Sequence, residues 1–397
     1  MVTVDNFSFA GKKALIRVDF NVPLDEAYRI TDTTRIDEAL PTIRKILADG
    51  GSAILMSHLG RPKDGPQEKY SLAHLTSYLS DVLHTAVHFA DDCVGESAEK
   101  AAAALQPGEV LLLENLRFHK EETKGDTDFA GQLARLGDIY VNDAFGTAHR
   151  AHASTAVIAQ FFGGRKCFGY LMASEIKHIG KVSSDPQKPF VAILGGAKVS
   201  DKLAIIENLL PKTDRILIGG GMMFTFIRAM GGQIGHSLCE NDMVDTCRNL
   251  LAEAERRGVT FVLPEDAVIN QTFANEGDIR TVNAHEIPDG YMGLDIGPGS
   301  VARFNEALHG AKTILWNGPM GVFEMSRFEN GTKGVAFGVA EATAAGAYSL
   351  VGGGDSVAAV GKYGLKEKVS YVSTGGGAML EFIEGKELPG IAAVLGQ

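Results

Sequence analysis

Short apolar runs alternate with helical stretches along the whole chain, and this alternation limits the possible folds more than any other feature. Runs such as Phe190–Leu194 are typical of strands buried on both faces of a parallel sheet. The runs form two series, at residues 14–18, 53–57, 110–114, 139–142 and 167–170, and at residues 190–194, 215–218, 260–263, 313–316, 348–351 and 369–373. Such alternation predicts parallel sheets covered by helices on both faces.

A polar, proline-containing link at 183–189 separates the two series. A helical stretch at about 173–181 precedes the link, and 397 residues are too many for one ordinary core. We therefore expect an α/β protein with two Rossmann-like, three-layer domains, over residues 1–172 and 190–380. An inter-domain helix and linker at 173–189 would join their parallel sheets as a helical hinge.

Composition narrows the function classes. Hydrophobic residues make up 45% of the chain and charged residues 22%, as in ordinary globular proteins, and the formal net charge of −11 disfavours general binding to nucleic acid or anionic membranes. The start Met-Val-Thr-Val-Asp is not typical of a signal peptide, and no apolar run is long enough to span a bilayer. The four cysteines contain no Cys-x-x-Cys pair, which favours a reducing, cytoplasmic compartment; they are Cys93, Cys167, Cys239 and Cys247.

Arginines recur where strands of the first series end. Ligands of parallel α/β sheets bind beyond the carboxyl ends of the strands, and Arg61, Arg117 and Arg150 each follow a strand there, with Arg35 after the first strand. Arginine binds phosphate or carboxylate in a fork, and several arginines converge only where an anion neutralises them. A single arginine is more often a surface ion pair, so the repetition is what predicts an anion site.

Other polar residues share these strand ends. Asp19 and Asn21 close the first strand and are suited to hydroxyl groups or a carboxylate. His58 follows the second strand, and we favour a ligand-binding role for it. For His149 and His152 a structural role and a ligand-binding role are equally compatible with the sequence.

The stretch Phe190–Lys202 joins a strand, two glycines and a helix start, a combination that favours an anion site. Lys198 and Lys202 are four residues apart, and we expect them on one face of the first turns of that helix. Two ammonium groups indicate a polyphosphate, although the pattern is not a Walker loop. The alternative is a tight turn with two solvated lysines.

More glycine turns follow the later strands. The triple glycine Gly219–Gly221 and the single Gly293 offer flat backbone to a planar base. In the turn Gly352–Ser356, Asp355 either caps the next helix or holds Mg²⁺, and we favour the metal because a bare carboxylate repels phosphate. The backbone N–H groups of Gly375–Gly377 are placed to receive charge that develops on a transferring group.

Eight of these pieces together resemble the phosphoglycerate kinase family, in the family's order and over nearly the whole chain. They read Arg-Val-Asp-Phe-Asn-Val-Pro, Ser-His-Leu-Gly-Arg-Pro, Glu-Asn-Leu-Arg-Phe, Asn-Asp-Ala-Phe-Gly-Thr-Ala-His-Arg, Leu-Gly-Gly-Ala-Lys-Val-Ser-Asp-Lys, Trp-Asn-Gly-Pro-Met-Gly-Val-Phe-Glu, Gly-Gly-Gly-Asp-Ser and Ser-Thr-Gly-Gly-Gly-Ala. The resemblance implies a glycolytic enzyme that reversibly transfers a phosphoryl group from 1,3-bisphosphoglycerate to ADP, giving 3-phosphoglycerate and ATP with Mg²⁺. It further implies a cytoplasmic monomer with no nucleic-acid or membrane partner.

The resemblance also implies a role for each matching residue. The triose site would comprise Asp19, Phe20, Asn21, Arg35, His58, Leu59, Gly60, Arg61, Arg117 and Arg150. The nucleotide site would comprise Lys202, Gly219, Gly220, Gly293, Asn317, Glu324, Gly353, Gly354, Asp355 and Ser356, with Asp355 as the metal ligand. The transferring phosphoryl group would be stabilised by Arg35, Lys198, Gly375 and Gly376. The C-terminal segment 381–397 would return to the first domain.

Phosphoryl transfer depends on positioning and charge neutralisation more than on covalent chemistry. We therefore expect direct in-line transfer after the domains close about a hinge at 173–189, without a phosphoenzyme or an obligatory general base. A dinucleotide oxidoreductase is one alternative, but no Gly-x-Gly-x-x-Gly with its distal acidic residue follows an early strand. A non-catalytic, two-lobed binding protein is another, and it has no need of Lys198 and Asp355. Gly299 and Met379 stand where relatives are more often polar, which affects only local packing.

Overall fold

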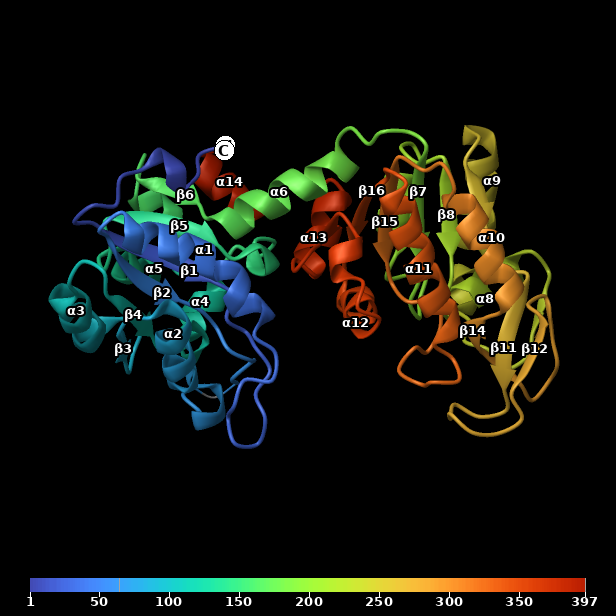
Figure 1. Cartoon of the computed structure of the whole chain (residues 1–397), viewed down its shortest axis with the longest axis horizontal. Helices are drawn as coiled ribbons and strands as arrows, with labels where there is room; N and C mark the ends of the chain where they lie inside the picture. The colour runs from blue at the N-terminus through green and yellow to red at the C-terminus, as the bar shows by residue number, and fades with distance from the viewer. Residues whose placement is uncertain (64, 397) are drawn as a thin grey trace. The chain divides into compact units, whose positions relative to one another are not determined.

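The computed structural model describes residues 1–63 and 65–396, and its strands and helices alternate as the sequence predicts (Figure 1). Two compact units divide the chain. The first comprises Met1–Lys177 together with the segment from Glu387 onward, and the second comprises His178–Lys386. Each unit contains one six-stranded parallel sheet, which confirms the predicted α/β class. Gln397, the last residue of the predicted C-terminal segment, lies outside the described residues.

The sheet of the first unit has the strand order β3-β4-β2-β1-β5-β6, and its neighbouring strands are parallel. The carboxyl ends of these strands therefore share one edge of the sheet. The strands are β1 (Lys13–Val18), β2 (Ser52–Met56), β3 (Val87–Ala90), β4 (Val110–Leu113), β5 (Ile139–Asp143) and β6 (Lys166–Phe168). The helices are α1 (Thr34–Ala48), α2 (Thr76–Leu83), α3 (Gly95–Ala104), α4 (Lys120–Lys124) and α5 (Thr127–Ala134).

The side chains of β1 show that both faces of this sheet are covered. Ala14, Ile16 and Val18 belong to one apolar cluster with Ile36 and other residues of α1. Successive side chains of a strand point to opposite faces, and Leu15 on the other face is also fully buried. Burial on both faces explains why such strands are continuous apolar runs in the sequence.

The second unit has a sheet of the same kind, with the order β10-β8-β7-β15-β16-β17 and parallel neighbours. Its strands are β7 (Phe190–Leu194), β8 (Arg215–Ile218), β10 (Thr260–Val262), β15 (Thr313–Asn317), β16 (Tyr348–Val351) and β17 (Tyr371–Val372). Its helices are α7 (Leu203–Leu209), α8 (Met223–Ala229), α9 (Val244–Arg257), α10 (Pro298–Leu308), α11 (Asn330–Ala344), α12 (Gly354–Lys362) and α13 (Gly377–Ile383).

The sequence did not predict a small antiparallel sheet that joins the second unit. It consists of β12 (Arg280–Asn283), β11 (Asp266–Asn270) and β14 (Met292–Ile296), in that order. Two further short strands, β9 (Gln233–Ile234) and β13 (Glu286–Ile287), pair with each other in parallel. β14 carries Gly293, one of the predicted nucleotide residues.

The helix α6 (Tyr170–Ser183) crosses the division between the units at Lys177. Its start corrects one prediction, because Tyr170 begins this helix and does not end a strand. Beyond Lys386 the chain packs on the first unit again, where α14 (Pro389–Leu395) contacts β6. The Lys166 ammonium group donates to the Ala393 carbonyl oxygen at 2.6 Å and fixes this contact. Among the described residues, no helix combines the length and the apolar character needed to cross a membrane.

Candidate active site

The arginines that the sequence singles out gather at the carboxyl edge of the first sheet. Electrostatic coupling shows their closeness: Arg17 and Arg61 both act on Arg117, and Arg117 and Arg150 both act on His152. Burial first, and then the neighbouring arginines, lower the pKa of Arg117 to about 10. A bound anion would relieve this mutual repulsion, so the cluster is suited to binding one.

Asp19 lies at the centre of this cluster. Its carboxylate accepts a hydrogen bond from the Arg35 guanidinium group, and its other oxygen lies 3.9 Å from Nδ1 of His58. Burial raises the pKa of Asp19, but the charges of Arg35 and Arg17 and a backbone hydrogen bond from Asn21 outweigh burial, so the pKa is lowered. Asp19 is therefore ionised and offsets part of the positive charge.

His58 is almost completely buried, and that burial holds its pKa well below the usual value. The arginines Arg17, Arg117 and Arg35 lower it further, against the pull of Asp19. His58 is thus a neutral imidazole in the ligand-free cluster, and Arg17 Nη2 lies 3.3 Å from its Nδ1. His58 therefore does not add positive charge to the ligand-free cluster. Its neutral ring can still form hydrogen bonds.

A glycine turn positions Arg117. Gly60 has φ +63°, donates its N–H to Asn21 Oδ1 at 2.8 Å and accepts from Arg117 Nη1 at 3.0 Å. A Cβ atom at Gly60 would lie 2.4 Å from the Tyr70 ring, so the turn requires glycine. Arg117 Nε is buried without a hydrogen-bond partner, which is costly unless a ligand accepts from it.

The remaining predicted triose residues differ in exposure. Phe20 and Leu59 are buried, and the Phe20 N–H donates to Ser57 Oγ at 2.8 Å, so both residues contribute packing and backbone shape. Arg61 and Arg150 are exposed and free to reach an incoming anion. His152 is largely buried, and burial followed by repulsion from Arg117 lowers its pKa to about 4.

Arg17 is a member of the cluster that the sequence did not reveal as a site residue. Its side chain is fully buried, and its Nε donates to Ser154 Oγ at 2.8 Å. Ser154 Oγ donates in turn to Glu122 Oε1 at 2.6 Å, and its N–H donates to Glu122 Oε2 at 3.0 Å. The network holds Arg17 in place beneath the exposed arginines. An arginine inside an otherwise apolar strand was the available signal.

The second unit contains a pocket of about 440 Å³ that suits a planar, mostly apolar ligand. Four predicted nucleotide residues line it, namely Gly220, Gly293, Glu324 and Asp355. Its other walls include Phe224, Leu238, Met292, Met320 and Val322. A Cβ atom at Gly293 would lie 2.0 Å from the Phe224 ring, so only glycine leaves this wall flat.

A second group of predicted residues forms a network behind the pocket. The Lys202 ammonium group donates to Asn317 Oδ1, and Asn317 Nδ2 donates to the Gly352 carbonyl oxygen at 2.7 Å. Ser356 Oγ accepts from the Gly318 N–H at 2.6 Å. Burial lowers the pKa of Lys202, against the attraction of Asp201 and Asp355. The network therefore ties the ends of β15 and β16 to the turn that follows β7.

Lys198 lies in that turn and not on a helix. The helix α7 begins only at Leu203, so the prediction that Lys198 and Lys202 share one helical face is wrong. The physical reason is Glu240, which the sequence analysis did not single out. Its carboxylate accepts from the Val199 N–H at 2.6 Å and from Ser200 Oγ at 2.5 Å, which holds the turn open. Lys198 is exposed there.

Asp355 lies in the first turn of α12 and is exposed at the edge of the pocket. Gly353, with φ +90°, is the N-cap of that helix, so the alternative role of Asp355 as a cap is excluded. A single accessible carboxylate suits Mg²⁺, which takes one or two protein carboxylates and completes its shell with substrate phosphate oxygens and water.

The last glycine turn is partly engaged already. The Gly375 N–H donates to Ser373 Oγ at 3.1 Å, and Gly376, with φ +51°, is the N-cap of α13. To stabilise a phosphoryl group, Gly375 must exchange its hydroxyl partner for the incoming oxygen. Met379, one of the two departures, is buried and packs beside Gly352, where a Cβ atom would lie 2.0 Å from its sulfur.

The first unit thus gathers arginines at the carboxyl edge of its sheet, and the second contains an apolar pocket with the Asp355 carboxylate at its edge. Comparison with known proteins identifies the family of the chain. The family description "Phosphoglycerate kinase" matches residues 4–386. A protein of that name from Porphyromonas gingivalis is 52% identical over 100% of both chains, and one from Chloroherpeton thalassium is 51% identical over 99% of this chain and 98% of its own.

Solved structures show the same similarity. The phosphoglycerate kinase from Coxiella burnetii is 40% identical, with a TM-score of 0.90 over 100% of this chain and 99% of its own. The phosphoglycerate kinase from Pyrococcus horikoshii is 32% identical, with a TM-score of 0.86 over 100% of this chain and 98% of its own.

Proposed function

Because the chain belongs to the phosphoglycerate kinase family, we propose that its first unit binds the triose and its second unit binds the nucleotide of the glycolytic reaction. The enzyme is a phosphotransferase that passes a phosphoryl group reversibly from 1,3-bisphosphoglycerate to ADP, giving 3-phosphoglycerate and ATP. One observation carries the assignment of the triose to the first unit, namely the buried and unpartnered Nε of Arg117 among mutually repelling arginines.

In the triose site, Arg61, Arg117 and Arg150 would neutralise the phosphate of 3-phosphoglycerate, since arginine forks match its oxygens. Asp19 and Asn21 would fix hydroxyl and carboxylate groups, with His58 donating or accepting as a neutral ring. Phe20, Leu59 and Gly60 would shape the backbone around the ligand. Arg35, which Asp19 holds, would face the carboxylate that receives the phosphoryl group.

In the nucleotide site, the base would lie against the glycine walls, and Glu324 would accept hydrogen bonds from the ribose. Lys202, Asn317 and the turn Gly353–Ser356 would hold the phosphates. Lys198, exposed and not committed to a helix, would follow the phosphoryl group as it moves. The amides of Gly375 and Gly376 would add hydrogen bonds to its oxygens. No covalent intermediate or general base is needed, because the acceptor is already an anion.

Asp355 would hold the Mg²⁺ that accompanies the nucleotide, and the ion would neutralise phosphate charge there. Asp355→Asn keeps the size of the side chain and removes its charge. We expect it to weaken binding of MgADP and to leave binding of metal-free ADP nearly unchanged, as measured by calorimetry with and without a chelator. Equal weakening in both titrations would remove Asp355 from the metal site.

Direct in-line transfer would require the two units to close on their substrates, with α6 and the linker to Pro189 as the hinge. Closure would also exclude water and suppress hydrolysis of ATP. Small-angle X-ray scattering tests this idea: 3-phosphoglycerate and MgADP together are expected to reduce the radius of gyration more than either ligand alone. An unchanged radius with both ligands would contradict closure.

The enzyme would act as a cytoplasmic monomer without nucleic-acid or membrane partners. The four free cysteines support a reducing compartment, and the large exposed apolar side chains come from separate segments, such as Phe161, Met230 and Phe337. Sedimentation at several protein concentrations measures the oligomeric state, and a mass that doubles with concentration would refute the monomer.

Activity itself is tested by ADP formation from MgATP that depends on 3-phosphoglycerate, with the acid and the metal omitted in turn. We expect turnover only when all components are present. ATP binding without turnover would support a two-lobed binding protein instead.

A further inference from the structure

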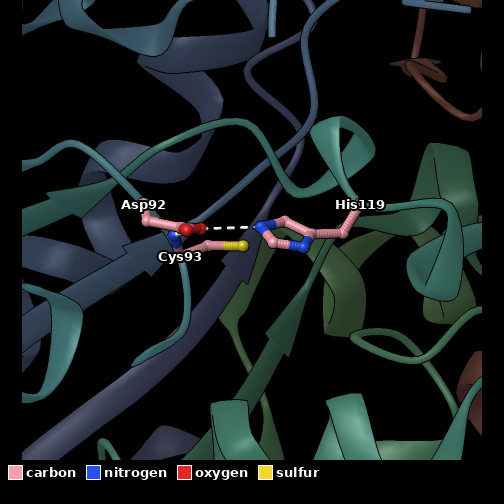
Figure 2. Close-up of side chains that lie close together, drawn as sticks. All are labelled: Asp92, Cys93 and His119. Carbon is pink, nitrogen blue, oxygen red and sulfur yellow. Dashed lines mark hydrogen bonds and ion pairs between the residues drawn. The ribbon is translucent and has the colours of Figure 1, made fainter. Parts of the chain in front are cut away.

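We propose that Asp92, Cys93 and His119 form a binding site for a thiophilic divalent metal ion such as Zn²⁺, in the first unit and separate from the nucleotide's Mg²⁺. One ligand atom from each residue lies within 4.8 Å of the others. Figure 2 shows Cys93 and His119 directed toward each other from opposite sides, with the Asp92 carboxylate beside them. The site is independent of the proposed function, which uses none of these three side chains.

The sheet itself brings the three residues together. Asp92 and Cys93 follow β3, whereas His119 follows the short 3₁₀ helix Leu116–Phe118 beyond β4. β3 and β4 are parallel neighbours, so their carboxyl ends and the loops after them are adjacent. Two independent segments therefore supply the ligands, and the rigid strands behind them fix the spacing.

Hydrogen bonds orient the carboxylate and the imidazole. Asp92 Oδ1 accepts from the Cys93 N–H at 2.6 Å and lies 2.7 Å from Nε2 of His119. The hydrogen bond from the Cys93 N–H holds the Asp92 carboxylate next to the backbone of Cys93. An ion entering the site would replace the shared proton between Asp92 and His119, and each residue would keep one atom directed at the centre.

The chemistry of the three ligands selects the kind of ion. A thiolate favours soft and borderline metals, and imidazole is the common nitrogen ligand of zinc, so Mg²⁺ and Ca²⁺ are poor candidates. Thiolate and carboxylate together balance a divalent charge. Bonds of about 2.0–2.3 Å around a tetrahedral zinc hold ligand atoms roughly 3.3–3.8 Å apart, so only small side-chain shifts separate this arrangement from a complete coordination set.

Exposure leaves room for entry and for a fourth ligand. The side chains of His119 and Asp92 are 30% and 44% exposed, while Cys93 is fully buried. A water molecule can therefore complete a three-residue site from the solvent side, as in other open zinc sites. An exposed His–Asp ion pair alone contributes little to stability. Stability therefore does not explain why the pair lies next to a buried cysteine.

The cysteine has no other evident chemistry. Its side chain is fully buried. A thiol that solvent does not reach is neither an accessible nucleophile nor a redox sensor. A metal ion that binds the sulfur displaces the thiol proton to solvent.

The test uses the full-length, chelator-treated protein without nucleotide, titrated with Zn²⁺ in a calorimeter and with Co²⁺ in a spectrophotometer. We expect one equivalent of Zn²⁺ and a thiolate-to-cobalt charge-transfer band. Cys93→Ser should abolish the band, and both Cys93→Ser and His119→Gln should weaken Zn²⁺ binding by more than about 10-fold. The controls are Cys247→Ser, another buried cysteine, and His88→Gln, which pairs with Glu109 away from any cysteine of the site. Both should bind as wild type does.

Three results would overturn the site. They are the absence of a charge-transfer band in the wild-type protein, a band that persists in Cys93→Ser, and Zn²⁺ affinities that are equal in all the variants. Because His119→Gln leaves the buried cysteine in place, its spectrum remains informative even if Cys93→Ser folds poorly.

Discussion

The two proposed binding sites are built by different physical means. In the first, five arginines lie near one another and their positive charges repel each other, namely Arg17, Arg35, Arg61, Arg117 and Arg150. In the second, the walls of the pocket include the backbone of Gly220 and Gly293, where an added Cβ atom would collide with a neighbour. One site is thus selective through charge and the other through shape.

This contrast follows from the ligands. A small, highly charged acid offers little apolar surface, so its binding must come from charge-assisted hydrogen bonds. A nucleotide offers a flat base, which binds by close approach to an apolar wall. We therefore expect ligand binding to depend on the charge of the substituted side chains in the first unit and on their volume in the second.

Lys198 is the exception that tests this contrast most strongly, because it is an exposed charge in the shape-selective unit. Lys198→Ala is expected to lower kcat about 100- to 1,000-fold, as for the loss of a group that stabilises the transition state. The KM for nucleotide should change far less. Steady-state kinetics measure both values, with exposed Lys312→Ala as the control. Equal losses in kcat and in nucleotide affinity would show that Lys198 serves ground-state binding.

In the charge-selective unit, Arg117→Ala should raise the KM for 3-phosphoglycerate roughly 10- to 100-fold, the cost of a lost charged hydrogen bond. The KM for MgATP should stay within about twofold. The control is Arg135→Ala, an exposed arginine that lies 3.6 Å from Glu99 in the same unit. If Arg117→Ala and Arg135→Ala behave alike, Arg117 does not bind the triose.

In the shape-selective unit, Gly293→Ala adds one methyl group and no charge. Because Phe224 must move to admit it, overpacking of about 1–3 kcal/mol is expected, which corresponds to roughly a 5- to 150-fold rise in the KM for MgATP. Gly164→Ala, at an open position in the first unit, is the matched control. An unchanged KM in Gly293→Ala would mean that the base does not approach this wall.

Each unit also buries a carboxyl group, which allows a comparison of stability. Burial raises the pKa of Asp143 to about 7 and of Asp295 to about 8. A raised pKa in the folded state means that the stabilising contribution is complete below about pH 4 and is lost as pH rises toward those values. Between these limits each group lowers stability by up to about 1.4 kcal/mol per pH unit.

The Asp295→Asn side chain cannot ionise. Between pH 5 and pH 8, the free energy of unfolding in urea should therefore fall less steeply with pH in this variant, by the slope that corresponds to one bound proton. Asp143→Asn should do the same in the first unit, up to about pH 7. Unfolding midpoints at several pH values provide the measurement. Unaltered slopes in both variants would mean that these carboxyl groups are ionised in the folded protein.

Much of the fold was predictable because buried parallel strands are marked in the sequence. β7 and β8 match their predicted bounds, since both are short apolar runs that end in glycine. β3 was missed because Val87–Ala90 is only partly buried at the sheet edge and has no continuous apolar run. Among the antiparallel strands, β12 was missed for a related reason, because its residues are all exposed or half-buried.

The candidate site was predictable where its residues lie at strand ends or in glycine turns, as at Asp19, His58 and Gly293. It was not predictable where partners are distant in sequence. Arg17 and Ser154 are 137 residues apart, and Ser200 and Glu240 are 40 apart. Local spacing therefore suggested a helix at Lys198, whereas the distant Glu240 carboxylate holds a turn there.

The central claim is that charge selects the triose in one unit and shape selects the nucleotide in the other. The most direct test titrates Arg117→Ala and Gly293→Ala separately with 3-phosphoglycerate and with MgADP, by calorimetry. We predict that each variant loses affinity for one ligand only, with Arg117→Ala affecting 3-phosphoglycerate and Gly293→Ala affecting MgADP. If either variant weakens both ligands equally, or if the pattern is reversed, the assignment of the two sites is contradicted.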